Sequence, residues 1–363
     1  MMESQEKNYC IILAGGVGRR LWPASTTELP KQFIDFFGTG RTLLQQTFDR
    51  FIRFIPLDHI FISTFADYVP IVREQLPEVP EQNILPEPVQ LNTAQAAVWS
   101  TWHVALRDAD ARVVVSPADQ LIQHEDRFEQ QVEKGLEFVA SHDQFLALGV
   151  RPTQPNTAYG YIQMGEEVNG GGLYKVQSFS EKPAIDYARM FMDSGEFLWN
   201  TGIFLWHAQV LGDALAHLSG RPSQNVEALA RQMVTIAEEM EYVRSSFSSE
   251  MPRSVDLFVL EKCKNVAVQE CDFGWADIGC WTSMRECGHK DADGNVVSGQ
   301  SKVMFMGTQR CMVRLPKEKC AVIAGLDNFL VVEKDDVLMI CPNDDPDFVR
   351  RMINEAQVYF GES

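Results

Sequence analysis

The chain has 363 residues, of which 45% are hydrophobic and 23% charged, values typical of a soluble globular protein with about two domains. Its formal net charge of −18 argues against nucleic-acid partners, because binding a phosphate backbone requires broad basic surfaces. No run of about 18 apolar residues predicts a membrane span, and the N-terminal apolar run is too short for a signal peptide.

The cysteines and histidines show no metal-binding pattern. The eight cysteines include no C-x-x-C pair, and their spacing suggests neither a zinc site nor a disulfide framework. We therefore expect reduced thiols in a cytoplasmic protein. The seven histidines are scattered along the chain, so core or surface roles are expected for them.

Between residue 9 and about residue 285, short apolar runs alternate with amphipathic stretches. The apolar runs predict buried strands at residues 9–14, 59–64, 112–116 and 144–150. Apolar residues at helical spacing predict helices at residues 42–54, 92–107 and 127–141. Asn92 or Thr93 is the expected cap of the second helix. The alternation predicts a largely parallel sheet covered on both faces, with ligands at the carboxyl ends of its strands.

After about residue 290 the pattern changes to short β-type runs separated by Gly, Pro and Asp/Asn turns. The predicted strands are residues 302–306, 311–315, 321–324, 329–332 and 337–340, followed by a helix at 345–359. We therefore expect two domains. Residues 1–290 form the α/β domain, and residues 291–363 form a small β-rich domain with a closing helix.

The first predicted strand runs directly into the loop LAGGVGRRLWP at residues 13–23. Gly15, Gly16 and Gly18 allow the backbone N–H groups to approach an anion without obstruction by a Cβ. A Rossmann dinucleotide loop would need a glycine in place of Leu21, and a Walker loop would continue with Gly-Lys-Ser/Thr. The sequence therefore disfavours an NAD-dependent oxidoreductase and a P-loop enzyme.

Three cations follow the glycines: Arg19 and Arg20 in the loop, and Lys31 in the segment PKQF. Separate cations around one nucleotide suit a triphosphate, since one can hold the leaving pyrophosphate while another lies at the α-phosphate. The alternative is an ordinary strand turn with solvated arginines.

The pattern G-G-x-G-x-R-L-W-P-x-S followed by P-K-Q-F resembles the signature of the mannose-1-phosphate guanylyltransferases. The resemblance covers about residues 8–345, and six further motifs follow in the order of that family. They are EP and NTA at 87–88 and 92–94, SPAD at 116–119, PT and YGYI at 152–153 and 159–162, FSEKP at 179–183, WNTG at 199–202 and WADIG at 275–279.

This resemblance implies a Rossmann-like nucleotide-diphospho-sugar transferase sheet, dependence on Mg²⁺, and transfer of GMP from GTP to mannose 1-phosphate, with a homodimer as one possible assembly. The implied nucleotide-binding residues are Ala14, Gly15, Gly16, Gly18, Arg19, Arg20, Lys31, Glu87, Asn92 and Asp119. The implied sugar-phosphate-binding residues are Gly160, Glu181, Lys182 and Asn200. The implied catalytic residues are Arg20, Lys31, Asp119 and Asp277.

Two carboxylates are the candidate magnesium ligands. Asp119 follows a buried strand, and a carboxylate there can bind Mg²⁺ together with phosphate oxygens and water. Asp277 resembles the second metal ligand of the family, although nothing in the sequence itself brings the two residues together. The alternative role for Asp277 is the N-cap of a helix at residues 280–286.

Glu87 is the candidate reader of the base. Guanine offers N1–H and N2–H₂ side by side, which one carboxylate can accept, whereas adenine lacks this pair of donors. The alternative is a solvated loop between Pro86 and Pro88. For the sugar phosphate, Lys182 can supply a point charge and Glu181 can accept hydrogen bonds from hydroxyls. Trp99 and Trp102, on the following helix, are expected in the core or at a subunit contact.

The chain departs from the family pattern at Thr26 and Leu91, where arginines are usual, at Gln120 in place of histidine, and at Ala158 in place of glycine. Two alternatives therefore stay open beside the guanylyltransferase. One is a nucleotidylyltransferase for another sugar 1-phosphate or another NTP. The other is a non-catalytic paralogue that binds a nucleotide sugar.

Overall fold

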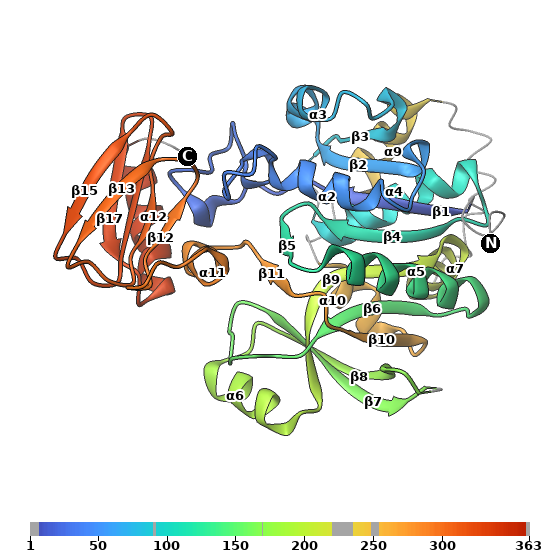
Figure 1. Ribbon diagram of the computed structural model, residues 1–363. Helices are drawn as coiled ribbons and strands as arrows, with labels where there is room; N and C mark the ends of the chain where they lie inside the picture. The colour runs from blue at the N-terminus through green and yellow to red at the C-terminus, as the bar shows by residue number, and fades with distance from the viewer. Residues whose placement is uncertain (1–6, 90–91, 169, 220–234, 248–253, 361–363) are drawn as a thin grey trace. The chain divides into compact units, whose positions relative to one another are not determined.

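The computed structural model describes residues 7–89, 92–168, 170–219, 235–247 and 254–360, and groups the chain into two compact units (Figure 1). The first unit comprises Met1–Gly15, Phe48–Ala118 and Ile122–Trp275. The second comprises Gly16–Thr47, Asp119–Leu121 and Ala276–Ser363. The boundaries of these compact units differ from those of the expected domains, 1–290 and 291–363. The two expected domains stay a prediction.

The first unit contains a nine-stranded sheet with the order β3-β2-β1-β4-β9-β6-β10-β8-β7. Its strands are β1 Asn8–Leu13, β2 Ile60–Phe65, β3 Ile84–Glu87, β4 Arg112–Pro117, β6 Phe145–Val150, β7 Gly160–Glu167, β8 Leu173–Glu181, β9 Phe197–His207 and β10 Val266–Cys271. The four strands predicted in this part of the sequence are confirmed as β1, β2, β4 and β6.

The sheet is mixed, so the expectation of a largely parallel sheet is correct only for part of it. Strands β1 to β4 are parallel, and β6 is parallel to β10. Strand β9, however, lies antiparallel between β4 and β6, and β8 is antiparallel to both β7 and β10. Apolar composition indicates a buried strand, but it does not specify the direction in which that strand enters the sheet.

Helices cover both faces of this sheet (Figure 1). On one face, Trp99 and Val104 of α4 share a core cluster with Ile11 and Val113. Neighbouring strand residues point to the opposite face, where α5 packs on β4, β6 and β9. The helices of this part of the chain are α2 Leu43–Phe51, α3 Val69–Gln75, α4 Thr93–Arg107, α5 Glu125–Ser141, α6 Ile185–Ser194, α7 Ala208–Ser219, α9 Ile236–Phe247 and α10 Val255–Phe258.

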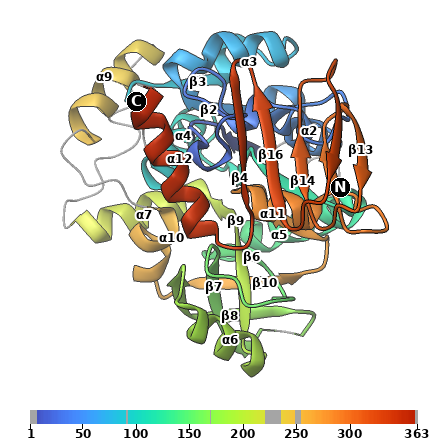
Figure 2. The same ribbon diagram turned by 90° about the vertical axis from the view of Figure 1, so that its left-hand side faces the viewer.

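The C-terminal part of the second unit contains two small sheets and a closing helix (Figure 2). One sheet has the order β12-β14-β16-β17, and the other pairs β13 with β15. The elements are α11 Trp281–Cys287, β12 Val296–Ser298, β13 Lys302–Met306, β14 Met312–Arg314, β15 Cys320–Ala324, β16 Phe329–Lys334, β17 Val337–Pro342 and α12 Pro346–Phe360. All five predicted runs and the predicted helix are confirmed, with bounds that differ by no more than two residues at either end.

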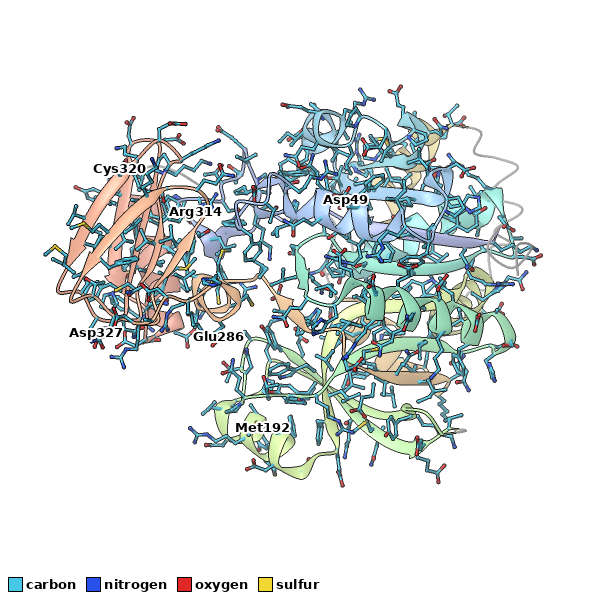
Figure 3. All side chains as sticks on the ribbon, in the orientation of Figure 1. Asp49, Met192, Glu286, Arg314, Cys320 and Asp327 are labelled. Atoms are coloured by element: carbon cyan, nitrogen blue, oxygen red, sulfur yellow. The ribbon has the colours of Figure 1, made fainter. Side chains whose placement is uncertain are left out.

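Neighbouring residues of β14 and of β16 pack into two different hydrophobic clusters of this unit. Val313 and Val331 pack with Ile323 of β15, whereas Met312 and Leu330 pack in the cluster that includes α12. The segment before α2 belongs to the same unit, because Arg314 (labelled in Figure 3) donates hydrogen bonds to the Asp35 carbonyl at 3.2 Å and to Ser298 Oγ at 2.9 Å. Burial lowers the pKa of Arg314 to about 10.

Within the described residues, none of the helices is both long and apolar enough to cross a membrane.

Candidate active site

The glycine loop of the second unit is shaped around Lys31. Gly18 has a φ of +69°, and a Cβ at this position would lie 2.7 Å from Lys31 Cγ and 2.8 Å from Ser25 Oγ. Ser25 in turn donates a hydrogen bond to the Val17 carbonyl at 3.1 Å. A glycine is therefore required at position 18 both by the backbone conformation and by the close approach of Lys31.

Lys31 is buried and is held by two oxygen atoms. It begins the short 3₁₀ helix η2 Lys31–Phe33 and is only 7% exposed. Its Nζ lies 2.7 Å from Asp119 Oδ2 and donates to the Ile278 carbonyl at 2.9 Å. Burial by itself lowers the pKa of Lys31, but the Asp119 and Asp277 carboxylates outweigh this effect, so the pKa is raised. Lys31 therefore carries its charge at neutral pH.

Arg20 and Asp277 belong to the same group of charges. A Cβ built on Gly279 would lie 2.5 Å from Asp277 Oδ2 and 3.0 Å from Arg20 Nη2, so both side chains converge on that glycine. Asp277 ends the short strand β11 Trp275–Asp277, which pairs with β5 Gln120–Ile122. The N-cap of α11 is Cys280, so the alternative role of Asp277 as a helix cap is wrong.

The donor set of this group fits a magnesium ion that also binds substrate. Asp119 and Asp277 offer the hard carboxylate oxygens that Mg²⁺ prefers, and one or two carboxylates suffice when phosphates and water complete the shell. Groups of three or more His, Cys, Asp or Glu side chains that could hold a metal ion do not occur in the described ranges. A closed metal site made by the described side chains alone is therefore not present.

In the first unit, Glu87 lies at the carboxyl end of β3, against the start of the glycine loop. Its carboxylate accepts a hydrogen bond from Ser63 Oγ at 2.8 Å. A Cβ on Gly15 would lie only 3.0 Å from Glu87 Oε2, and the residue is 1% exposed. Ala14 is fixed beside it, because its N–H donates to the Ser63 carbonyl at 2.7 Å. The alternative of a solvated loop at Glu87 is wrong.

Asn92 is the N-cap of α4 and was one of the two residues predicted for that position. Its Oδ1 accepts a hydrogen bond from the Thr93 N–H at 2.7 Å. Trp99 is buried in the core, and Trp102 is partly buried against the same cluster, so the core alternative holds for both. The departure at Leu91 lies outside the described residues.

The four candidate residues for the sugar phosphate come together in the first unit. Gly160 of β7 pairs with Glu181 of β8. A Cβ on Gly160 would lie 2.8 Å from Glu181 Oε2 and 3.5 Å from Asn200 Nδ2. Lys182 follows with a φ of +46° and forms an ion pair with Glu181. The lack of a Cβ at position 160 thus allows a carboxylate oxygen and an amide nitrogen to approach the backbone closely.

One residue of this group was missed by the sequence analysis. Asp256 of α10 accepts a hydrogen bond from Asn200 Nδ2 at 3.1 Å and is 7% exposed. The segment Ser254–Asp256 resembles an ordinary helix start, and nothing in its spacing relates it to Asn200. Two of the other departures make local hydrogen bonds: Thr26 Oγ1 accepts from the Leu29 N–H at 3.1 Å, and the Ala158 N–H donates to Asn156. The third, Gln120, is buried in β5.

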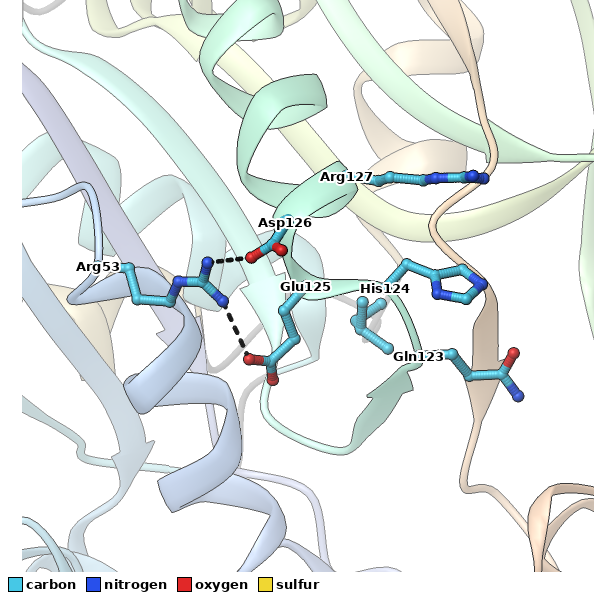
Figure 4. A pocket seen from close by; sticks show the side chains of 7 residues that line it. Arg53, Gln123, His124, Glu125, Asp126 and Arg127 are labelled. Atoms are coloured by element: carbon cyan, nitrogen blue, oxygen red, sulfur yellow. Dashed lines mark hydrogen bonds and ion pairs between the residues drawn. The ribbon is translucent and has the colours of Figure 1, made fainter.

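A separate pocket of about 680 Å³ in the first unit contains none of the candidate residues (Figure 4). It lies at the N-terminus of α5, and its charged lining residues include Arg53, Glu125, Asp126 and Arg127. Arg53 pairs with Glu125 and Asp126. Arg127 pairs with Asp272, which lies outside the lining.

The model of the family described as "Nucleotidyl transferase" matches residues 9–294, a range that includes every candidate site residue. The chain belongs to the nucleotidyl transferase family. Among similar proteins, this nucleotidyltransferase is 31% identical to a putative mannose-1-phosphate guanylyltransferase of Vibrio cholerae, over 96% of this chain and 74% of that protein. It is 33% identical to the alginate biosynthesis protein AlgA of Pseudomonas fluorescens, over 95% of this chain and 71% of that protein.

The fold is also that of a solved relative. A crystal structure from Thermus thermophilus, named a mannose-1-phosphate geranyltransferase, matches with a TM-score of 0.83 and 28% identity, covering 97% of this chain and 99% of that one. This match confirms the expected fold class, a Rossmann-like transferase sheet followed by a small β-rich region.

Proposed function

We propose that this nucleotidyltransferase transfers GMP from GTP to mannose 1-phosphate, giving GDP-mannose and pyrophosphate. The observation that carries the proposal is the cluster that Arg20, Asp119 and Asp277 form around the buried ammonium group of Lys31. Such a set of cations and carboxylates suits a triphosphate with a metal ion. The choice of guanine and mannose is supported by the names of the relatives from Vibrio cholerae and Salmonella montevideo, at 31% and 30% identity.

In the proposed reaction, a phosphate oxygen of the sugar 1-phosphate attacks the α-phosphorus of GTP. The new P–O bond forms as the bond from the α-phosphorus to the bridging oxygen breaks, and pyrophosphate leaves with that electron pair. A phosphate monoester is already nucleophilic at neutral pH, so no side chain is assigned the role of base. Lys31 and Arg20 position the phosphates and neutralise their charge in the transition state.

Asp119 and Asp277 are the residues that would hold Mg²⁺. When bound, the ion supplies charge neutralisation to the phosphate oxygens. The two carboxylates also raise the pKa of Lys31, so that this buried side chain stays protonated. Lys31 is thereby maintained as a fixed positive charge.

The other candidate residues bind the remaining groups of the two substrates. Ala14, Gly15, Gly16, Gly18, Arg19 and Asn92 are assigned to the nucleotide. Glu87 accepts hydrogen bonds from guanine, while Gly160, Glu181, Lys182 and Asn200 bind the sugar phosphate. These roles rest on the motif resemblance and on the local geometry within each unit.

The test is product identity after incubation of the protein with mixed NTPs, mixed sugar 1-phosphates and Mg²⁺. GDP-mannose as the dominant product supports the proposal. Another nucleotide sugar would assign the alternative of a different sugar or base, which the departures at Thr26, Leu91, Gln120 and Ala158 leave open. Binding of nucleotide without release of pyrophosphate would identify a non-catalytic paralogue.

We also propose that the protein works in the cytoplasm, where its eight cysteines, all free of disulfide bonds, would stay reduced. A homodimer is proposed from the family resemblance, and light scattering on the purified chain would test it.

A further inference from the structure

The side-chain amide of Asn200 is fixed at both ends. Its Oδ1 accepts a hydrogen bond from the Gly202 N–H at 3.0 Å, and its Nδ2 donates to Asp256 Oδ2 at 3.1 Å. An ionised carboxylate can only accept and a backbone N–H can only donate, so Asp256 and Gly202 together determine which end of the amide is the nitrogen. These two bonds leave one N–H of Nδ2 to donate elsewhere.

The fixed nitrogen lies beside Gly160. The point that a Cβ on Gly160 would occupy is 3.5 Å from Asn200 Nδ2 and 2.8 Å from Glu181 Oε2. A donor and an acceptor therefore both lie close to Gly160, whose lack of a Cβ allows them to approach its backbone. A sugar hydroxyl both donates and accepts, so one hydroxyl can accept from Asn200 while it donates to Glu181.

Asp256 is itself held in place, away from solvent. It is 7% exposed and lies in the first turn of α10. The preceding N–H, that of Val255, donates to Thr93 Oγ1 at the start of α4 at 3.3 Å. A buried carboxylate carries a desolvation penalty that a leucine would avoid. Its presence beside an amide therefore calls for a role, and the role that the contacts support is to accept from the Asn200 N–H.

We infer that Asp256 is a positioning residue for sugar recognition. It holds the Asn200 amide with its nitrogen toward Gly160, so that the site offers a donor beside the Glu181 acceptor. Without Asp256, only the hydrogen bond from the Gly202 N–H opposes rotation of the amide. A rotated amide would present its oxygen and place two acceptors beside one hydroxyl. The inference rests on the proposed function only in assigning Asn200 and Glu181 to the sugar.

The test compares the Kd of GDP-mannose with that of GDP by titration calorimetry, because their ratio isolates the contribution of the sugar. In Asp256→Leu we expect binding of GDP-mannose to weaken about tenfold, the loss of one hydrogen bond, while binding of GDP is unchanged. In Asp256→Asn, the new amide can still accept from Asn200 through its own oxygen. This conservative variant should therefore recover most of the affinity for GDP-mannose.

A swapped double variant, Asn200→Asp with Asp256→Asn, separates positioning from simple structural support. The swap keeps a hydrogen bond between the two positions. Its thermal stability should therefore be closer to that of the wild type than the stability of Asp256→Leu is. It places a carboxylate next to Glu181, however, so affinity for GDP-mannose should stay low. This variant also keeps the inference testable if Asp256→Leu does not fold.

Glu239→Leu is the matched control. Glu239 is another buried carboxylate of the first unit, and it accepts hydrogen bonds from Trp99 Nε1 at 3.3 Å and His103 Nδ1 at 2.7 Å. Its loss should lower stability and leave the ratio of the two dissociation constants unchanged.

Three outcomes would overturn the inference. They are an unchanged ratio in Asp256→Leu, recovery of GDP-mannose affinity in the swapped variant together with its stability, and equal binding of GDP and GDP-mannose by the wild type. Failure of the proposed function is seen separately, as absence of pyrophosphate release by the wild-type protein with GTP, mannose 1-phosphate and Mg²⁺.

Discussion

Lys31 Nζ lies 2.7 Å from Asp119 Oδ2, and this ion pair joins the segment after the glycine loop to the short connection between β4 and β5. The Lys31 side chain is 9% exposed, and the Asp119 side chain is 25% exposed. The more accessible partner can thus reach a ligand, while the less accessible one supplies a fixed charge behind it. The first two predictions follow from this relationship.

Lys31→Met should lower turnover far more than it lowers stability. A charge that stabilises the transition state at the α-phosphate typically contributes about 3–4 kcal/mol, which corresponds to a loss of roughly 10²- to 10³-fold in kcat. The measurement is steady-state release of pyrophosphate, with thermal unfolding recorded on the same preparations.

Lys7→Met is the control for this experiment, since Lys7 also forms an ion pair with an aspartate, Asp110, but at an exposed position. It should leave both turnover and stability nearly unchanged. A folded Lys31→Met protein with wild-type kcat would remove Lys31 from the mechanism.

Asp119→Asn and Asp277→Asn should each raise the Mg²⁺ concentration needed for half-maximal activity and lower the maximal rate. Loss of one carboxylate weakens an ion held through two of them plus substrate oxygens. Asp119→Asn should show the larger effect, because it also removes the negative charge of the ion pair with Lys31. Magnesium titrations of pyrophosphate release measure both effects.

Chelation gives an independent check on the metal. Addition of EDTA should abolish turnover, and excess Mg²⁺ should restore it. Full activity in EDTA, or an unchanged magnesium titration in both variants, would contradict the assignment of a metal to these carboxylates.

Glu87→Gln should weaken discrimination for guanine. Glutamine can still accept from Ser63 through its oxygen, so its NH₂ group takes the place of Oε2, the atom beside Gly15. A donor then faces a donor of the base, and the lost interaction should cost about 2–3 kcal/mol of binding free energy. The value of kcat/KM for GTP should therefore fall roughly 30- to 150-fold. Inosine triphosphate lacks the N2 amine, so the variant should discriminate less between GTP and ITP than the wild type.

The quantity to compare is the GTP/ITP ratio of kcat/KM in both proteins, with Glu81→Gln as an exposed control. Equal ratios in Glu87→Gln and the wild type would show that Glu87 does not contact the N2 amine.

Gly18→Ala should destabilise the protein more than Gly40→Ala. Both glycines belong to the second unit and have positive φ, +69° and +82°, so each alanine should cost roughly 1–2 kcal/mol of backbone strain. At Gly18 the new Cβ would also overlap Lys31 and Ser25, whereas nothing lies within 4 Å at Gly40. Overpacking should add about 1–3 kcal/mol.

Denaturant unfolding of both variants gives the difference directly. If Gly18→Ala loses no more stability than Gly40→Ala, the close approach of the loop to Lys31 is not tight in solution.

The sequence by itself located part of the elements and named the candidate residues. Apolar periodicity located strands β1, β2, β4 and β6 and strands β13 to β17, because the pattern of burial along an element is local in the chain. Asn92 was one of two candidate caps for the same reason. The motifs also named Lys31 and Asp119 before any contact between them was known.

Only the tertiary structure decided how distant segments combine. The antiparallel entry of β9 between β4 and β6 depends on how the chain returns after β7 and β8, and a strand's composition carries no sign of its direction. The contacts of Lys31 with Asp119 and of Asn200 with Asp256 are likewise long-range. Asp256 shows the limit most clearly, because a Ser-x-Asp segment looks like any helix start until the fold brings an amide against it.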